Sequence, residues 1–392
     1  MMINKTFSYL LKNGEGWPPT VRPKPPLGPS MVEIVRSCPL RSCFDASPGY
    51  ERRMDYPARV GTAFHRTLQS FYEKGLPIDR EKAVNEARKR FEQELQRQET
   101  DARSRPRESA LPHDTIRVDR AVESLILEAI RFMNLGYVPP SPHNVFSDSS
   151  QFDVVFDKTS SNAPGSPVEV EVPVRSNDGY FQGRIDRVEH TDEGTVIYDF
   201  KSALRDDLPG RYQRQIQLYS LMWRDTRNEW PTAGYVVYPL TGKSYQVAID
   251  PDLCQSITDE SAELVDRMQK EPVFSRLALP GDTCTVCEYR PWCNPFWAWQ
   301  ADEKSHLRAI ERSSLGFSGL ITRLDLNNHR WHINLSWRNA TVRLSAPEER
   351  LPYLHKAQVG QTALVLDTKM QGAPYTPLAV FTEYSELFIL TT

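Results

Sequence analysis

The sequence predicts an α/β protein that carries a small β-barrel at its C-terminal end. Two observations lead to this prediction. Between residues 30 and 302, segments whose apolar residues recur every three or four positions are interspersed with segments in which apolar and polar residues alternate. From residue 310 to residue 392, only short alternating segments separated by turns are found.

The N-terminal third is expected to be helical after an extended arm. Residues 1–29 are rich in proline, which predicts an arm that lies on the surface or stays loose. Ser30 is expected to cap the first helix, with Glu33 at the capping-box position. Helical periodicity extends from about residue 60 to residue 135, with a polar loop expected at residues 96–112.

The middle of the chain changes to the two-residue period of strands. Strands are predicted at residues 166–175, 180–190 and 195–203, and a helix at 211–226. A hairpin over residues 233–250 and a further helix over 252–269 complete an α/β core.

Composition limits the class of protein. The chain has 392 residues and a net charge of −3, which excludes a histone-like basic binder but allows a local basic cleft. No run approaches the roughly 18 apolar residues of a membrane helix. The N-terminus has no secretion signal, so we expect a cytoplasmic protein without a membrane partner.

Two acids and a lysine stand on neighbouring predicted strands. Asp199 and Lys201 lie two residues apart on one strand, so they face the same side, and Asp186 lies on the preceding strand across one turn. Two ionised carboxylates side by side repel each other unless a divalent cation lies between them. A lysine beside them can orient water or stabilise developing phosphate charge. The alternative is a surface hairpin with ordinary charges, but the apolar neighbours make an idle charged pair costly.

Further motifs occur in a fixed order around this hairpin. They are G-x-x-x-H at Gly61–His65, G-x-I-D-R at Gly183–Arg187, D-x-K at Asp199–Lys201 and Q-x-x-x-Y at Gln215–Tyr219. Taken together, this set resembles the RecB-type branch of the PD-(D/E)XK nuclease superfamily, over about residues 30–295. The resemblance implies a mixed central sheet flanked by helices, with a helical insertion.

The resemblance also implies roles for these residues. His65, Asp186 and Asp199 would bind Mg²⁺ or Mn²⁺, helped by the backbone carbonyl of Phe200. Lys201 would be the catalytic lysine beside Asp186 and Asp199, and Gln215 and Tyr219 would position the substrate strand. Many relatives carry another acid upstream of G-x-I-D-R, for which Glu169 and Glu171 are candidates.

The six cysteines of the chain include a second group of candidate site residues. Cys284, Cys287 and Cys293 fall within ten residues, which in a chain without an export signal indicates metal binding rather than disulfides. The spacing leaves a four-cysteine Zn²⁺ site and an iron–sulfur cluster both open. The resemblance extends to AddB-like proteins and CRISPR-associated exonucleases, which implies a [4Fe-4S] cluster with Cys38 as the fourth ligand. Cys43 is the alternative fourth ligand, and both it and Cys254 are otherwise expected in the core.

The C-terminal region combines aromatic and basic residues. Trp331, Trp337, Arg330 and Arg338 lie close together in the sequence, which suggests an OB-like barrel that stacks single-stranded bases and contacts phosphates. Two alternatives are that the tryptophans are core residues, or that the barrel docks a protein.

These observations predict a metal-dependent DNA nuclease. The resemblance implies an exonuclease on single-stranded DNA or DNA ends, acting in repair, recombination or defence. One alternative is a non-catalytic DNA-binding clamp of a helicase–nuclease complex. Since the sequence contains no Walker A motif, any helicase or ATPase motor would be a partner chain. Another alternative is a zinc-stapled interaction protein with an incidental acidic hairpin.

Overall fold

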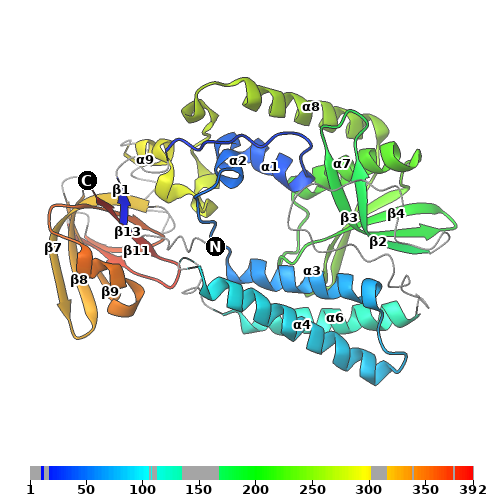
Figure 1. Cartoon of the computed structure of the whole chain (residues 1–392), viewed down its shortest axis with the longest axis horizontal. Coiled ribbons are helices and arrows are strands. Elements are labelled where there is room, and N and C mark those ends of the chain that lie inside the picture. Colours follow the sequence, from blue (N-terminus) through cyan, green and yellow to red (C-terminus); the bar gives the residue numbers. More distant parts are fainter. Residues whose placement is uncertain are drawn as a thin grey trace, which may run out of the picture.

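The computed structural model describes residues 10–12, 17–105, 107, 113–134, 167–301, 316–337, 340–373 and 376–391. The described α-helices all lie before residue 302 (Figure 1). They are α1 (Pro29–Ser37), α2 (Pro39–Ala46), α3 (Tyr56–Lys74), α4 (Arg80–Arg103), α6 (Thr115–Asn134), α7 (Gly210–Arg227), α8 (Pro251–Lys270) and α9 (Asn294–Ala301).

A five-stranded mixed sheet forms the centre of residues 27–301, as the alternating segments predicted. Its strands are β2 (Val168–Arg175), β3 (Gln182–Thr191), β4 (Gly194–Phe200), β5 (Ala233–Tyr238) and β6 (Lys243–Val247), paired in that order. Neighbouring strands are antiparallel except β4 and β5, which are parallel and joined through α7.

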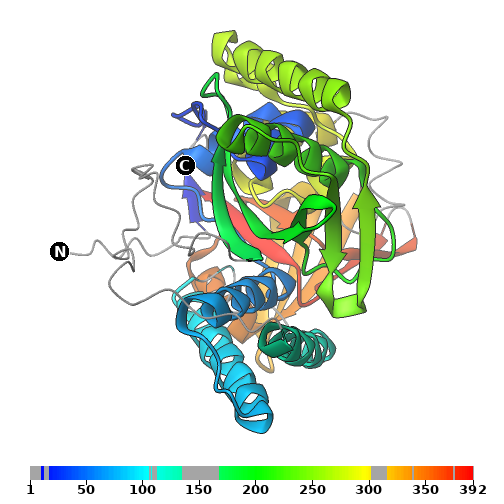
Figure 2. The same ribbon diagram turned by 90° about the vertical axis from the view of Figure 1, so that its right-hand side faces the viewer.

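Helices cover both faces of this sheet. One apolar core joins it to α1, α2, α7 and α8, and a second joins it to α3, α4 and α6. Figures 1 and 2 show these two helical layers on opposite sides of the strands. Helix α4 runs to Arg103, past the start of the loop expected at residues 96–112, because Gln98 and Ala102 are buried one turn apart on the same face. The fold is therefore α/β, as predicted.

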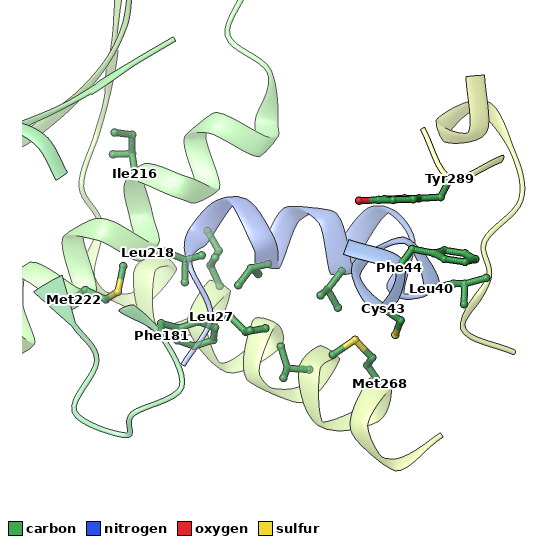
Figure 3. Packing of buried hydrophobic residues seen from close by; sticks show 14 of the residues in the cluster. Leu27, Leu40, Cys43, Phe44, Phe181, Ile216, Leu218, Met222, Met268 and Tyr289 are labelled. Carbon is green, nitrogen blue, oxygen red and sulfur yellow. The ribbon is translucent and has the colours of Figure 1, made fainter. Parts of the chain in front are cut away.

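The N-terminal helices and the cysteine-rich segment share one core although about 250 residues separate them. Figure 3 shows Leu40, Cys43 and Phe44 of α2 near Met268 of α8 and Tyr289. The rings of Phe44 and Tyr289 stack with centroids 5.4 Å apart. This packing brings the start and the end of residues 27–301 together.

The first helix begins differently from the prediction. Helix α1 starts at Pro29 with Gly28 as its N-cap, so Ser30 does not cap it. Proline is favoured at the first helical position because its ring already fixes a helical φ. Glu33 forms a paired contact with Arg214 of α7, with distances of 2.9 and 2.6 Å, instead of a capping box.

The N-terminal arm is not loose over its described residues. Leu10–Lys12 form β1, which pairs in parallel with β13 at the far end of the chain. Further on, Leu27 is buried and exchanges backbone hydrogen bonds with residues 180 and 182. The arm therefore joins both sheets of the molecule.

The C-terminal region is an open sheet over the residues that the structure describes, so the expected closed barrel is not found. The strands after residue 315 are β7 (Gly316–Asn327), β8 (Arg330–Trp337), β9 (Ala340–Pro347), β10 (Thr362–Leu366), β11 (Lys369–Ala373), β12 (Thr376–Val380) and β13 (Glu386–Thr391). With β1 they form an eight-stranded sheet in the order β1-β13-β10-β7-β8-β9-β12-β11. The two edge strands of this sheet are β1, which pairs with β13, and β11, which pairs with β12.

The expected stacking surface on this sheet is only partly present. Trp331 is 5% exposed and belongs to the core, because β8 alternates and the position faces inward. Trp337 is half-buried and its ring lies 5.2 Å from that of Phe317. Arg330 is exposed, and Arg338 lies outside the described residues.

Buried ion pairs join the C-terminal sheet to the rest of the chain. Arg107 donates to both carboxylate oxygens of Glu386 at 2.8 and 2.9 Å. Arg290 does the same to Asp367 at 2.9 Å each, and its Nε donates to the carbonyl of Cys287. Because Arg290 lies in the cysteine-rich segment, its pair with Asp367 fixes the C-terminal sheet against that segment, while Arg107 joins the sheet to the chain after α4.

No helix in the described ranges has both the length and the apolar character required to cross a membrane.

The buried pair of Glu386 and Arg107 makes a testable prediction about stability. Glu386→Gln should lower the free energy of unfolding by about 3–5 kcal/mol, because it leaves the Arg107 charge buried without its partner. The arginines hold the pKa of Glu386 below its ordinary value despite burial, so the pair stabilises the fold above about pH 4.3 and is lost as the pH falls. Urea denaturation at several pH values measures both effects.

The control is Glu349→Gln, at an exposed position of the same region, which should stay within about 0.5 kcal/mol of the wild type. Equal stability of the two variants at neutral pH would contradict the account of the interface.

Candidate functional site

Three carboxylates lie side by side at the same level of three neighbouring strands. The β2–β3 register pairs Val170 with Arg187 and Val172 with Ile185, which places Glu171 opposite Asp186. The β3–β4 register ends at Arg187 and Tyr198, which places Asp199 next to Asp186. The backbone N–H of Phe200 donates to Asp186 Oδ2 at 2.6 Å and fixes that carboxylate. The sheet therefore gathers three negative charges at one end.

Helix α3 closes one side of this cluster. His65 lines a small pocket together with Glu171, Asp186 and Phe200. Gly61, one turn earlier, lets the helix approach the end of β4, since a Cβ atom there would lie 2.1 Å from Ser202 Oγ. The G-x-x-x-H spacing thus combines close approach of the helix with a histidine at the acids.

A second contact holds the same strand end. Arg117 of α6 donates to the carbonyl of Ser202 at 2.8 Å, and its own Nε donates to Asp114. The residue that follows Lys201 therefore contacts both α3 and α6.

Helix α7 closes the other side. Gln215 is 4% exposed, and its Oε1 has no hydrogen-bond partner among the described residues. Tyr219 lies one turn further on and packs against Gly183 of β3, where a Cβ atom would be 2.9 Å from its ring. Burial, together with the charges of the three acids, raises the pKa of Tyr219 well above its ordinary value. Tyr219 thus lies beside the acidic cluster, and Gln215 occupies a buried position one turn before it on the same helix.

Lys201 and Asp199 form an ion pair within the site. Lys201 Nζ lies 2.6 Å from Asp199 Oδ2. Burial lowers the pKa of Lys201, but the charges of Asp199 and Asp186 outweigh it, so its pKa is raised. Burial and the neighbouring Asp186 raise the pKa of Asp199, which Lys201 opposes. The lysine stays protonated and partly offsets the negative charge of the cluster.

Glu171 is the site residue that the sequence left unresolved. It has a left-handed φ of 49°, which is uncommon for a residue other than glycine. Burial and the charge of Asp186 raise its pKa to about 7. The other candidate, Glu169, instead contacts His190 at 2.7 Å and Arg227 at 2.8 Å. Strand alternation alone could not separate two acids of equal parity, because it predicts both on the same face of the strand.

This donor set suits a divalent cation. Carboxylate oxygens and an imidazole nitrogen are ordinary ligands for Mg²⁺ or Mn²⁺, and a cation would offset both the burial and the charge of Asp186 that raise the pKa of Glu171. In the parts of the chain described, no three His, Cys, Asp or Glu side chains converge tightly enough to coordinate a metal as they stand. At Asp199, Lys201 Nζ takes up one carboxylate oxygen.

The four cysteines singled out from the sequence come together in space. Cys38, Cys284, Cys287 and Cys293 line one pocket, with Arg41 and Arg290 at its wall. Burial raises the pKa of Cys287 to about 12, and burial also raises the pKa values of Cys284 and Cys293. Buried thiols of this kind stay protonated unless a positive charge lies beside them, and their sulfur atoms do not converge tightly enough in the described chain to coordinate a metal as they stand.

The remaining two cysteines lie elsewhere in the core. Cys43 is fully buried within α2, outside the pocket lining. Cys254 is fully buried in α8 and donates to Gln217 Oε1 at 2.7 Å.

Comparisons with known proteins identify one family. The family model described as the PD-(D/E)XK nuclease superfamily matches residues 26–294. No curated protein matches the chain. A solved structure titled "Crystal structure of SSO0001" is 12% identical, covers 68% of this chain and 95% of its own, and has a TM-score of 0.26, too low to support an argument.

The close approach of α3 to β4 is testable at Gly61. Gly61→Ala places a methyl group 2.1 Å from Ser202 Oγ and 2.9 Å from Ser202 Cβ, so we expect a loss of about 1–3 kcal/mol in unfolding free energy. Gly210→Ala is the matched control, since the nearest atom to its Cβ is the flexible Arg214 Nη1 at 3.4 Å. Urea denaturation compares the two. An unchanged Gly61→Ala variant would show that the helix is not held against the strand end.

Proposed function

Since the chain belongs to the PD-(D/E)XK nuclease superfamily, we propose that it is a metal-dependent DNA nuclease of the RecB type. Its substrate would be single-stranded DNA or DNA ends, and its activity exonucleolytic. The observation that supports this most strongly is the convergence of Asp186, Asp199, Lys201 and His65 at one end of the sheet. An ion pair with a purely structural role would not need a histidine and two further carboxylates around it.

The divalent cation would be held by His65, Asp186 and Asp199, with the backbone carbonyl of Phe200. Glu171 faces the same position from β2, and we assign it to the same cation, directly or through water. When bound, Mg²⁺ or Mn²⁺ supplies Lewis acidity and lowers the pKa of water. The hydrogen bond from Phe200 N–H orients Asp186 before any ligand arrives.

Lys201 and helix α7 would act on the substrate. Lys201, with its raised pKa, is charged at neutral pH and would align the attacking water and stabilise negative charge on the phosphate. Gln215 presents a buried amide oxygen that has no partner in the described part of the chain, and this oxygen would bind the substrate strand. Tyr219, beside Gly183, would limit where that strand lies.

The cysteine pocket would hold a [4Fe-4S] cluster bound by Cys38, Cys284, Cys287 and Cys293. The alternative is a structural Zn²⁺ bound by the same residues. Either centre would join the start and end of the nuclease domain, which we place at residues 30–302, and so offset the entropy of closing a long loop. Its role is therefore structural.

The C-terminal sheet would hold nucleic acid or a protein partner beside the nuclease. We place this region at residues 310–392. The exposed Arg330 and the half-buried Trp337 remain candidates for contacts with nucleic acid. A cytoplasmic role in repair, recombination or defence, with a helicase or ATPase as partner, is consistent with this organisation.

Lys201→Ala tests the proposed function. End-labelled single-stranded DNA should be cleaved by the wild type with Mg²⁺ or Mn²⁺ but not with EDTA. The variant should lose about 10²–10³-fold in kcat, because it lacks the charge that stabilises the phosphate. Lys243→Ala, which removes an exposed lysine of β6, should retain activity.

A folded wild type that binds DNA without cleaving it would instead favour the non-catalytic clamp of a helicase–nuclease complex. Equal activity of Lys201→Ala and the wild type would contradict the assigned role of the lysine.

A second prediction separates the two cysteines of the N-terminal helices. Protein purified without oxygen should show broad visible absorbance and about four irons per chain. Cys38→Ser should lose both, because it removes a ligand, whereas Cys43→Ser should keep both. Zinc in place of iron would support the alternative site, and a metal-free, colourless protein would contradict both.

A further inference from the structure

Lys201 has a second contact that no motif accounts for. Its Nζ lies over the ring of Tyr212, 5.0 Å from the centroid, in addition to its ion pair with Asp199. A cation within about 6 Å of an aromatic face is attracted by the negative charge of that face. The ammonium group is therefore held by a carboxylate and a ring together.

Neighbouring groups hold Tyr212 in place. Its ring packs at 61° to that of Tyr238, with centroids 6.3 Å apart, and its backbone N–H donates to the carbonyl of Pro209. It lies three residues before Gln215 and seven before Tyr219, so it extends the same face of α7 by one turn. The ring also contacts Arg211, whose Cζ lies 4.7 Å from the ring centroid.

We propose that Tyr212 is a positioning residue, which keeps the Lys201 ammonium group pointed into the site during the reaction. The inference rests on the proposed nuclease function. Once Asp199 shares its charge with a divalent cation, its hold on Lys201 weakens, while the ring of Tyr212 is unaffected. The aromatic contact is then what prevents the flexible lysine side chain from leaving the phosphate.

The test compares Tyr212→Leu, Tyr212→Phe and Tyr245→Leu on end-labelled single-stranded DNA with Mn²⁺. Tyr245 is the matched control, because its ring also packs on Tyr238, at 5.9 Å, but belongs to β6. We expect Tyr212→Leu to lower kcat about tenfold with KM unchanged, and Tyr212→Phe to restore it, because the phenyl ring keeps its negative face. Tyr245→Leu should leave kcat as in the wild type.

A second measurement does not depend on activity. The rate at which an amine-modifying reagent labels Lys201, read by mass spectrometry, should rise in Tyr212→Leu and not in Tyr212→Phe or Tyr245→Leu. A raised KM with unchanged kcat would overturn the proposal and mark Tyr212 as a substrate contact. Unchanged kcat and labelling would overturn it as well. If the wild type does not cleave DNA but Lys201 is still labelled faster in Tyr212→Leu, only the proposed nuclease function fails. Tyr212 then holds Lys201 in a structural role.

Discussion

The repulsion among Glu171, Asp186 and Asp199 is the constraint on which the site depends. Strand register places these carboxylates at one level of β2, β3 and β4. Burial raises the pKa values of Glu171 and Asp199 and so opposes their ionisation. The surrounding elements supply what offsets this cost: the lysine that directly follows β4, a backbone N–H of Phe200, and a histidine from α3. The two helical layers are needed to bring these groups to one end of the sheet.

Local patterns predicted most of this site because its residues obey simple periodicities. Asp199 and Lys201 share a face by the two-residue period of a strand, and Gln215 and Tyr219 by the turn of a helix. The three strands, α7 and the hairpin were likewise predicted by alternation and turn residues. Three of the four cysteines were found by their clustering, whereas Cys38 came only from the family resemblance. Spacing cannot say how far α3 lies from β4, however, and that distance depends on Gly61 meeting Ser202.

What local patterns left open or missed concerns contacts between distant segments. Glu169 and Glu171 stayed open as alternatives because they have the same parity on one strand, and only the packed structure shows which of them lies beside Asp186. The N-terminal arm contributes β1 to a sheet formed more than 300 residues later, and no local signal announces that pairing. Trp331 faces the core because only one face of β8 is covered. Alternation shows that residues of β8 face two sides, but not which of the two sides is the buried one.

The central claim is that this acidic cluster holds a divalent cation beside Lys201. A crystal structure of the protein grown with Mn²⁺, with diffraction measured at the manganese absorption edge, tests it most directly. The account predicts an anomalous peak within coordination distance of His65, Asp186 and Asp199, with Lys201 released from its ion pair. Lys201 still paired with Asp199, and no peak at this end of the sheet at saturating Mn²⁺, would contradict it.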